Sequence, residues 1–563
     1  MDKKWKIIFL IYADFTKDGT VPLDEKLERE LERVFQDLLS CSIQPNVQLF
    51  VVFHSLKYLS AAEDNAVRLN NETIISEVHS NKGSNSFETI CRLDNGSGGP
   101  GGRLQRSSRL TAIMKEIQAV SQQADHILLA TWDHGAAFGI FADAENSIEL
   151  LKPIDSHIED FPAFNNFLKS AGVELARSTD PHWAPTGMEP VYKVGHTKFT
   201  FVDKALPELV NPILVKNLYT DHFKVSANAV NNVLTLNRTI ADFHREDIKG
   251  LISEEKYAII KAKVFNAQTQ TMVADIEEPF DILTNDELAE AIQYGLGQTV
   301  DVLLMMNCWM VNVHTAYALR NTVSFLVGPQ TGIDEPGYDY QRIIEQMTPA
   351  TTPEGLIAIC MQTFECPDRA KYGALADKIQ ESAILAMDLK AFEALKIADI
   401  LDKVARLTLS MLQQRGLEFV IKSARRHCFV FNESKEYFLI DFVHWLHALL
   451  ATGIFEFEIG VGTTMKFELS GSYQSLLRYI AKNPVPFIGP RIYNDNRRSG
   501  KITNEPPTGF TIYFPEKSDD FLQADKWLFE LIRTSSFIRE KENWLEAITS
   551  WDKVQQPAMA TPD

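Results

Sequence analysis

One stretch of the chain, Asp301–Tyr340, constrains the fold more than any other. It contains two short apolar runs, Val302–Met306 and Val323–Val327, and the residues between them are apolar at helical spacing. Short, fully apolar runs are typical of buried strands, so the stretch predicts a strand, a helix and a second strand. Cys308 follows the first run directly, and we expect it where that strand gives way to the helix.

This position would make Cys308 reactive. A cysteine at the amino end of a helix has backbone N–H groups and the positive end of the helix dipole beside it, and both stabilise a thiolate. A nucleophile of this kind needs a histidine, and His134 follows another buried-strand run, Ile127–Thr131. Neighbouring strands of an open parallel sheet bring their carboxyl ends to one crevice. We therefore predict that Cys308 and His134 meet there.

Composition excludes several classes of protein. The chain has 563 residues and a net charge of −19, from 75 acidic and 56 basic residues, without a basic cluster. Nucleic acid is therefore not an expected partner, because its backbone demands concentrated positive charge. No run approaches the ~18 apolar residues of a membrane span, so we expect no membrane partner. Six cysteines in so long a chain do not form a disulfide framework.

The amino terminus raises the question of secretion. Its first fifteen residues have the lysines and the apolar stretch of a signal peptide but no small-residue cleavage site. We expect this stretch to be the first strand of the fold and the protein to be cytoplasmic. A secreted protein whose signal had been removed would have the same sequence features.

The length also predicts an insertion. About 160 residues separate the histidine loop from the cysteine strand, far more than one crossover needs. We expect the first half of the core at 1–154, an insertion at 155–280 that caps the crevice or recognises a partner, and the second half at 281–380. Residues 381–563 are expected to be helical and α+β, with a long helix at Leu389–Leu412 and strands in the alternating stretch Ile454–Leu469.

These blocks together resemble a known family. A strand ending in Asp-His-Gly, a later strand ending in Cys-Trp-Met, and a downstream Gly-Pro-Gln followed by Glu-Pro-Gly-Tyr-Asp-Tyr resemble the clostripain family of cysteine peptidases. The late stretches TGFTIYFP and ENWLEAI resemble the end of that family's sequence. The resemblance implies a caspase-like α/β fold, in which a mostly parallel sheet is sandwiched by helices, with the large insertion between the histidine and cysteine blocks.

The resemblance also implies a mechanism. Cys308 and His134 would form a catalytic dyad that cleaves a protein or peptide substrate, and the N–H groups of Gly135 and Cys308 would bind the oxyanion. We expect no required cofactor and no metal site. The family includes calcium-dependent and self-processing members, but the chain has no Asp-rich loop with calcium-ligand spacing. Calcium dependence is therefore implied by the resemblance alone.

One substitution departs from the family pattern. Many members place an aspartate two residues before the nucleophile, where it selects Arg or Lys in the substrate, and Met306 occupies that position here. An apolar side chain cannot neutralise a buried guanidinium, which costs several kcal/mol if it is left unpaired. Met306 and Trp309 therefore predict an apolar substrate pocket. Preference for basic residues would require an acid on another wall, for which the candidates are Asp133, Asp334 and Glu335.

Other readings of the same residues stay open. Cys308 could be a packed thiol and His134 a turn residue, in a caspase-like fold that is catalytically silent and serves as a binding or scaffolding module. A third possibility is another thiol-dependent hydrolase or transferase on a similar sheet. Iodoacetamide separates packing from catalysis, because a thiol of low pKa reacts before the other five cysteines. The oligomeric state is not predicted.

Overall fold

The structure, a computed structural model, describes most of the chain outside the predicted insertion. The described residues are 3–13, 25–55, 72–81, 84–94, 104, 107–141, 173–177, 190–194, 197–200, 282–333, 336–412, 418–431, 439–451, 461–498, 507–515, 532 and 535–550.

Two compact units make up the chain. The first comprises Met1–Asn95, Arg103–Glu145 and Ile282–Asp563, and the second comprises Gly96–Gly102 and Asn146–Asp281. In the second unit the described residues form an antiparallel sheet of β7 (Val173–Arg177), β8 (Pro190–Val194) and β9 (Thr197–Thr200). The rest of the predicted insertion at 155–280 lies outside the described residues, so its role stays a prediction.

A nine-stranded sheet is the centre of the first unit. Its five middle strands are parallel, and antiparallel strands extend it at both edges. The strand order is β15 (Phe487–Ile488), β13 (Ala383–Asp388), β12 (Val323–Pro329), β11 (Val300–Met306), β5 (Ala124–Trp132), β1 (Lys3–Ala13), β2 (Val47–Ser55), β3 (Glu72–Asn81) and β4 (Ser84–Asp94). The middle strands have nearly continuous apolar runs because both faces of the sheet are covered.

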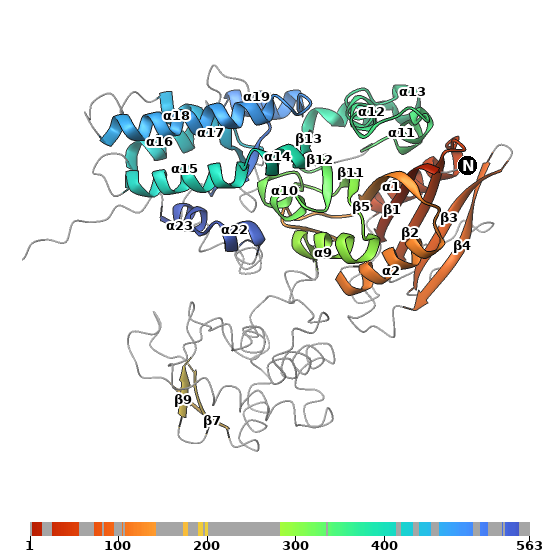
Figure 1. Cartoon of the computed structure of the whole chain (residues 1–563), viewed down its shortest axis with the longest axis horizontal. Helices are drawn as coiled ribbons and strands as arrows, with labels where there is room; N and C mark the ends of the chain where they lie inside the picture. The colour runs from red at the N-terminus through yellow and green to blue at the C-terminus, as the bar shows by residue number, and fades with distance from the viewer. Residues whose placement is uncertain are drawn as a thin grey trace, which may run out of the picture. The chain divides into compact units, whose positions relative to one another are not determined.

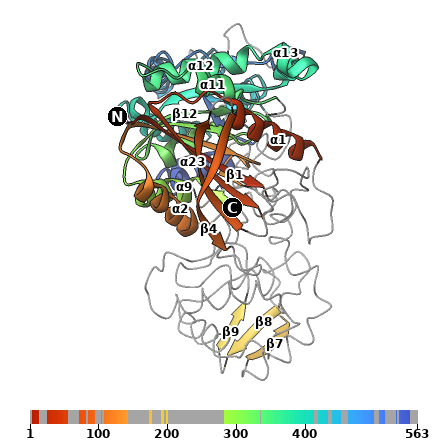
Figure 2. The ribbon, with the colours of Figure 1, turned by 90° about the vertical axis from the view of Figure 1, so that its right-hand side faces the viewer.

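Helices cover both faces of this sheet (Figures 1 and 2). One layer shares a core cluster with alternate residues of the strands and consists of α1 (Glu25–Ser40), α11 (Tyr340–Gln346) and α12 (Pro353–Glu365). The other layer consists of α2 (Ser107–Val120), α9 (Asn285–Leu296) and α10 (Val313–Leu319). The predicted α/β class, a mostly parallel sheet between helices, is confirmed.

Local sequence explains how the chain enters β11. Thr284 and Glu287 form a capping box at the start of α9, in which each side chain accepts a hydrogen bond from the other residue's backbone N–H. The helix ends at Gly297, whose φ of 63° favours glycine. Three residues later β11 begins. The short turn fixes where the strand carrying Cys308 at its end enters the sheet.

The remaining elements follow β12 or form short pairs. The helices are α13 (Arg369–Tyr372), a 3₁₀ helix (Gly373–Glu381), α14 (Leu389–Ala394), α15 (Ile397–Leu412), α16 (Glu418–Arg426), α17 (Phe442–Ala451), α18 (Val461–Ile480), α19 (Pro490–Arg498), α22 (Ser536–Glu540) and α23 (Glu542–Ser550). The strand pairs are β6 (Gly139–Ile140) with β10 (Leu283–Thr284) and β14 (Leu439–Asp441) with β16 (Thr511–Tyr513). Among the described residues, no helix combines the length and apolar character that crossing a membrane requires.

Two expectations for the C-terminal part were wrong. The predicted helix Leu389–Leu412 is two helices, α14 and α15, with Lys396 between them at a φ of 52°. The alternating stretch Ile454–Leu469 predicted strands, but from Val461 onwards it is the start of α18. The residues that α18 buries recur at helical spacing, at Met465, Leu469, Ser472 and Leu476, and this longer period outweighs the local alternation.

Candidate active site

The two candidate catalytic residues extend from neighbouring strands. β5 and β11 pair in parallel, and their last paired residues are Trp132 and Met306. His134 and Cys308 therefore each lie two residues beyond the same pair, at the carboxyl edge of the sheet. Both residues are half-buried. The structure thus brings the two predicted segments together at one edge.

Gly135 is where the two segments touch. A Cβ on Gly135 would lie 2.5 Å from the carbonyl oxygen of Cys308 and 2.8 Å from its nitrogen, so any side chain there would displace the cysteine. Gly135 also forms a bridge with Ile140, made by the hydrogen bonds Phe141 N–H to His134 O and Ala136 N–H to Gly139 O. In such a bridge the N–H of Gly135 itself is not used. The N–H groups of Gly135 and Cys308 therefore come from adjoining backbone.

Unusual backbone conformations gather around these residues. Among the described residues, five other than glycine have positive φ, and four of them lie in the two segments. These four are Asp133 (152°), Ala137 (61°), Phe141 (59°) and Trp309 (61°). Positive φ is costly for residues with a side chain and tends to cluster at functional sites. The cluster supports a functional role for this edge of the sheet.

The expected source of thiolate stabilisation was wrong. Helix α10 begins only at Val313, and its cap is Asn312, whose Oδ1 accepts hydrogen bonds from the N–H groups of His314 and Thr315. Cys308 lies four residues before this cap, so the helix end does not serve its sulfur. Instead the backbone N–H of Ile333 donates to Cys308 Sγ, with 3.3 Å between the two atoms. This donor follows β12 and was not anticipated from the sequence.

The loop that provides this donor also contacts the predicted pocket residues. Trp309 donates its backbone N–H to Thr331 O at 3.0 Å, and its indole lies beside Gly332. Met306 places its thioether against Gly337, where a φ of 61° and the nearby sulfur both favour glycine. The residues after β12 therefore form one wall beside Cys308.

The role of each pocket candidate stays a prediction. The Met306 side chain packs in the core cluster and is only 6% exposed. Asp133 is also buried, at 6% exposed, and its carbonyl oxygen accepts a hydrogen bond from the side chain of Asn307. Asp334 and Glu335 lie outside the described residues. Among the described candidates, Met306 and Trp309 contact the loop after β12.

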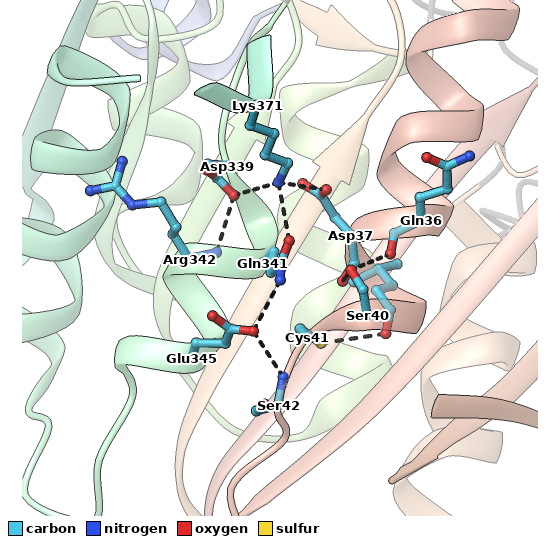
Figure 3. Close-up of polar contacts among 11 residues, drawn as sticks. Gln36, Asp37, Ser40, Cys41, Ser42, Asp339, Gln341, Arg342, Glu345 and Lys371 are labelled. Carbon is cyan, nitrogen blue, oxygen red and sulfur yellow. Dashed lines mark hydrogen bonds and ion pairs between the residues drawn. The ribbon is translucent and has the colours of Figure 1, made fainter. Parts of the chain in front are cut away.

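The far end of the same loop is held by a buried ion-pair network (Figure 3). Lys371 Nζ lies 2.7 Å from Asp37 Oδ1 on α1 and 2.9 Å from Asp339 Oδ1 at the start of α11. Asp339 also caps α11 by accepting the N–H of Arg342. The lysine thus joins α1 to the residue where the loop becomes a helix.

Sequence comparison extends these observations. The model of the clostripain family matches residues 228–450, a range that includes Cys308 and the loop after β12 but begins after His134. The resemblance to the clostripain family is confirmed. This match supports a cysteine peptidase function for the chain. No curated protein matches it in sequence.

Solved clostripain-type (C11) proteases resemble the chain at low identity. A secreted C11 cysteine protease from Bacteroides thetaiotaomicron, iotapain, is 10% identical, with a TM-score of 0.46 and coverage of 96% of this chain and 99% of that chain. An inactive zymogen C11 protease from Parabacteroides distasonis is 11% identical, with a TM-score of 0.42 and coverage of 95% of this chain and 97% of that chain.

Four of the other five cysteines differ from Cys308 in burial, whereas Cys91 is half-buried like it. Burial raises the pKa of Cys360 to about 12 and is the main cause that raises the pKa of Cys41 to about 12. Cys428 is also buried, and Cys366 is exposed. The described residues contain no group of three or more His, Cys, Asp or Glu side chains that could hold a metal ion.

Proposed function

We propose that the chain is a cysteine endopeptidase with Cys308 as nucleophile and His134 as general acid and base. The observation that carries the proposal is the register of β5 and β11, which puts both residues two positions beyond one strand pair. His134 takes the thiol proton, Cys308 Sγ attacks the scissile carbonyl carbon, and His134 gives that proton to the leaving amine. Water then hydrolyses the thioester, with His134 accepting its proton.

Backbone donors serve the two charged species of this reaction. The N–H groups of Gly135 and Cys308 stabilise the oxyanion that forms when the thiolate attacks. The N–H of Ile333, 3.3 Å from Cys308 Sγ, favours the thiolate before attack, because a hydrogen bond to the charged form lowers the pKa of a group. The dyad supplies both nucleophile and proton donor, so the proposal includes no cofactor and leaves calcium dependence as an implication of the family resemblance.

The proposed substrate is a peptide with an uncharged residue at the cleavage site. Met306 lies two residues before Cys308 and its thioether is beside Gly337, whereas Trp309 directly follows Cys308 and its indole is beside Gly332. Apolar surface gains about 25 cal/mol for each Å² of substrate that it buries and gains nothing from a cation. Medium or large uncharged side chains are therefore preferred over Arg and Lys, unless an acid such as Asp133, Asp334 or Glu335 faces the substrate.

A peptide library tests both parts of the proposal. Cys308→Ala removes only a sulfur, so turnover falls on the order of 10³-fold or more while the thermal midpoint stays nearly unchanged. Cys366→Ala, at an exposed cysteine, is the matched control and keeps full activity. Mass spectrometry of the wild-type products gives the cleavage sites, and dominant cuts after Arg or Lys would show an acidic pocket.

The competing function is a silent binding module with the same fold. The substitution of Met306 for the family's aspartate favours this alternative, because it removes a residue that many members use to hold substrate. It is supported if the library stays uncut and iodoacetamide modifies Cys308 no faster than the exposed Cys366 at neutral pH. Residual activity above about one per cent in Cys308→Ala assigns the turnover to another residue.

A further inference from the structure

Asn307 occupies the position between the end of β11 and Cys308. It is completely buried, at 0% exposed, although strand ends at this edge of the sheet border the candidate active site. Its Nδ2 donates to the carbonyl oxygens of Asp133, at 3.0 Å, and His134, at 3.1 Å. Its Oδ1 accepts the hydroxyl hydrogen of Thr131, at 2.5 Å. Every strong hydrogen-bonding group of the carboxamide therefore connects the cysteine strand to the histidine strand.

The chemistry of the three partners requires an amide. Two adjacent carbonyl oxygens need a group with two N–H donors, and the Thr131 hydroxyl fixes which end of the amide faces them. An aspartate would place a negative oxygen against the two carbonyls. An apolar residue would leave both carbonyls without this donor in a buried setting. Many side chains could fill this space, whereas asparagine also makes all three hydrogen bonds.

The carbonyl of His134 is held from two sides. It accepts Asn307 Nδ2 at 3.1 Å and the backbone N–H of Phe141 at 3.0 Å. The next residue, Gly135, lies against the backbone of Cys308. The position of His134 relative to the cysteine therefore depends on a short chain of contacts that starts one residue before Cys308.

We propose that Asn307 is a positioning residue that sets the distance and orientation of His134 relative to Cys308, an inference that rests on the proposed peptidase function. Asn307 touches neither substrate nor the reacting atoms in this role. Its effect passes through the His134 backbone. Misplacement of a catalytic group by about 1 Å costs on the order of 10²-fold in rate, so a small movement of this loop has a large effect on the reaction.

The test compares two buried asparagines in the full-length chain. Asn85, on the edge strand β4, also donates Nδ2 to two carbonyl oxygens, those of Leu38 and Cys41, and it is 8% exposed. Asn85→Ala therefore removes the same kind of contact away from β5 and β11. Both variants are assayed for kcat and KM on a peptide cut by the wild type, and for the rate of Cys308 alkylation by iodoacetamide between pH 5 and pH 10.

Asn307→Ala is expected to lower kcat roughly 30- to 100-fold with KM within about threefold, because the dyad loses its geometry while the substrate wall remains. Alkylation of Cys308 at pH 6 slows at least about tenfold, since a thiolate without its imidazolium partner forms only near its ordinary pKa of about 8.5. At pH 10 the alkylation rate of the variant stays within about twofold of the wild-type rate, because the thiol is ionised in both proteins. Asn85→Ala changes neither kcat nor the alkylation profile.

Thr131 provides a second variant pair if Asn307→Ala does not fold. Thr131→Val removes the hydroxyl that orients the amide, and we expect a roughly fivefold loss of kcat with the same change in the alkylation profile. Thr131→Ser keeps the hydroxyl, so we expect the wild-type kcat and the wild-type alkylation profile.

The inference is overturned if Asn307→Ala keeps kcat within threefold and the wild-type alkylation profile, or if Asn85→Ala reproduces its defects. A wild type with neither turnover nor low-pH alkylation of Cys308 overturns the proposed function itself, and the two failures are thus distinguished.

Discussion

His314 shows how a single buried side chain links the fold to pH. Its ring lies between Phe138 and Phe537, with centroid distances of 5.0 Å to each. Within the described part of the chain, neither ring nitrogen has a hydrogen-bond partner. Burial lowers the pKa of His314 from its ordinary value to about 3, so the ring is neutral in the folded protein. His314 therefore packs as a neutral aromatic ring, and its imidazole can bind a proton readily only when the protein unfolds.

Acid should destabilise the fold through this residue. The folded pKa of about 3 lies below the unfolded value of about 6.5, so the unfolded state takes up the proton first as the pH falls. The resulting loss in the free energy of unfolding is absent above pH 7 and reaches about 2 kcal/mol at pH 5. His314→Phe removes it, and urea unfolding of both proteins at pH 7.5 and pH 5 measures the difference. His427→Gln, at an exposed histidine, is the control, and equal pH dependence in wild type and His314→Phe would contradict the prediction.

Residue positions at the site could be predicted only in part from the sequence. Cys308 and His134 were placed at strand ends because short apolar runs precede them, and the register of β5 and β11 agrees with that placement. Asn307 was missed, because one amide that bonds to two carbonyls across the sheet leaves no periodic signal. The only available hint was a polar residue directly between a buried strand and a cysteine. The donor at Ile333 is a backbone group, and no side-chain pattern identifies it.

At the scale of elements, the ion pairs around Lys371 join α1 to the start of α11 (Figure 3). The Asp37 side chain is 5% exposed and that of Asp339 only 1%. Burial raises the pKa of the Asp37 carboxyl, and the neighbouring Lys371 opposes this rise. Without the lysine, the two buried carboxylates would lose the cation that both of them contact.

Lys371→Met should therefore be strongly destabilising at neutral pH. Removing one partner of a buried pair leaves an uncompensated charge, and we expect a loss of roughly 3 kcal/mol in the free energy of unfolding at pH 7. The loss should shrink as the pH falls towards 4. A carboxyl whose folded pKa is raised takes up its proton in the folded state first, and protonation removes the unpaired charge. Denaturant unfolding at several pH values measures this trend.

A matched surface pair gives the control for this experiment. Lys541 pairs with Asp399 at 2.6 Å; the lysine side chain is 18% exposed, but that of the aspartate is 60% exposed and stays hydrated. Lys541→Met should cost less than about 1 kcal/mol, because exposed ion pairs contribute little. The buried-charge explanation fails if both lysine variants lose the same stability, or if the loss in Lys371→Met does not depend on pH.

Elements were predicted well where one period dominates the sequence. The parallel strands β1, β5, β11 and β12 were recognised from their apolar runs, because burial on both faces makes such runs continuous. Two failures occurred where patterns compete. Alternation at Ile454–Leu469 masked the helical spacing of α18, and the apolar pattern continues through Lys396 although the helix does not. A single residue with positive φ ends a helix without changing its hydrophobic period.

At the scale of the whole molecule, the C-terminal part of the chain joins the central sheet. Strands β13 and β15 extend the nine-stranded sheet beyond β12. The Thr511 hydroxyl on β16 donates to Val311 O at 2.8 Å, and it accepts Gln330 Nε2 at 3.3 Å. Gln330 Nε2 also donates to Gly509 O. These contacts reach both segments beside Cys308, and since the Thr511–Val311 contact spans 200 residues, no local pattern predicts it.

Thr511→Val should therefore impair catalysis and stability together. The variant removes the hydroxyl between the segment after Cys308 and the segment whose Ile333 N–H contacts the sulfur. We expect a stability loss of about 1–3 kcal/mol and, because both segments lose this hydrogen-bonded link to β16, a roughly tenfold lower kcat. Thr408→Val is the control, since this buried hydroxyl on α15 donates within its own helix to Val404 O at 2.9 Å. It should lose comparable stability and keep its kcat. Equal kcat values for the two variants, measured on the same peptide well below their unfolding temperatures, would show that β16 supports the fold without supporting the site.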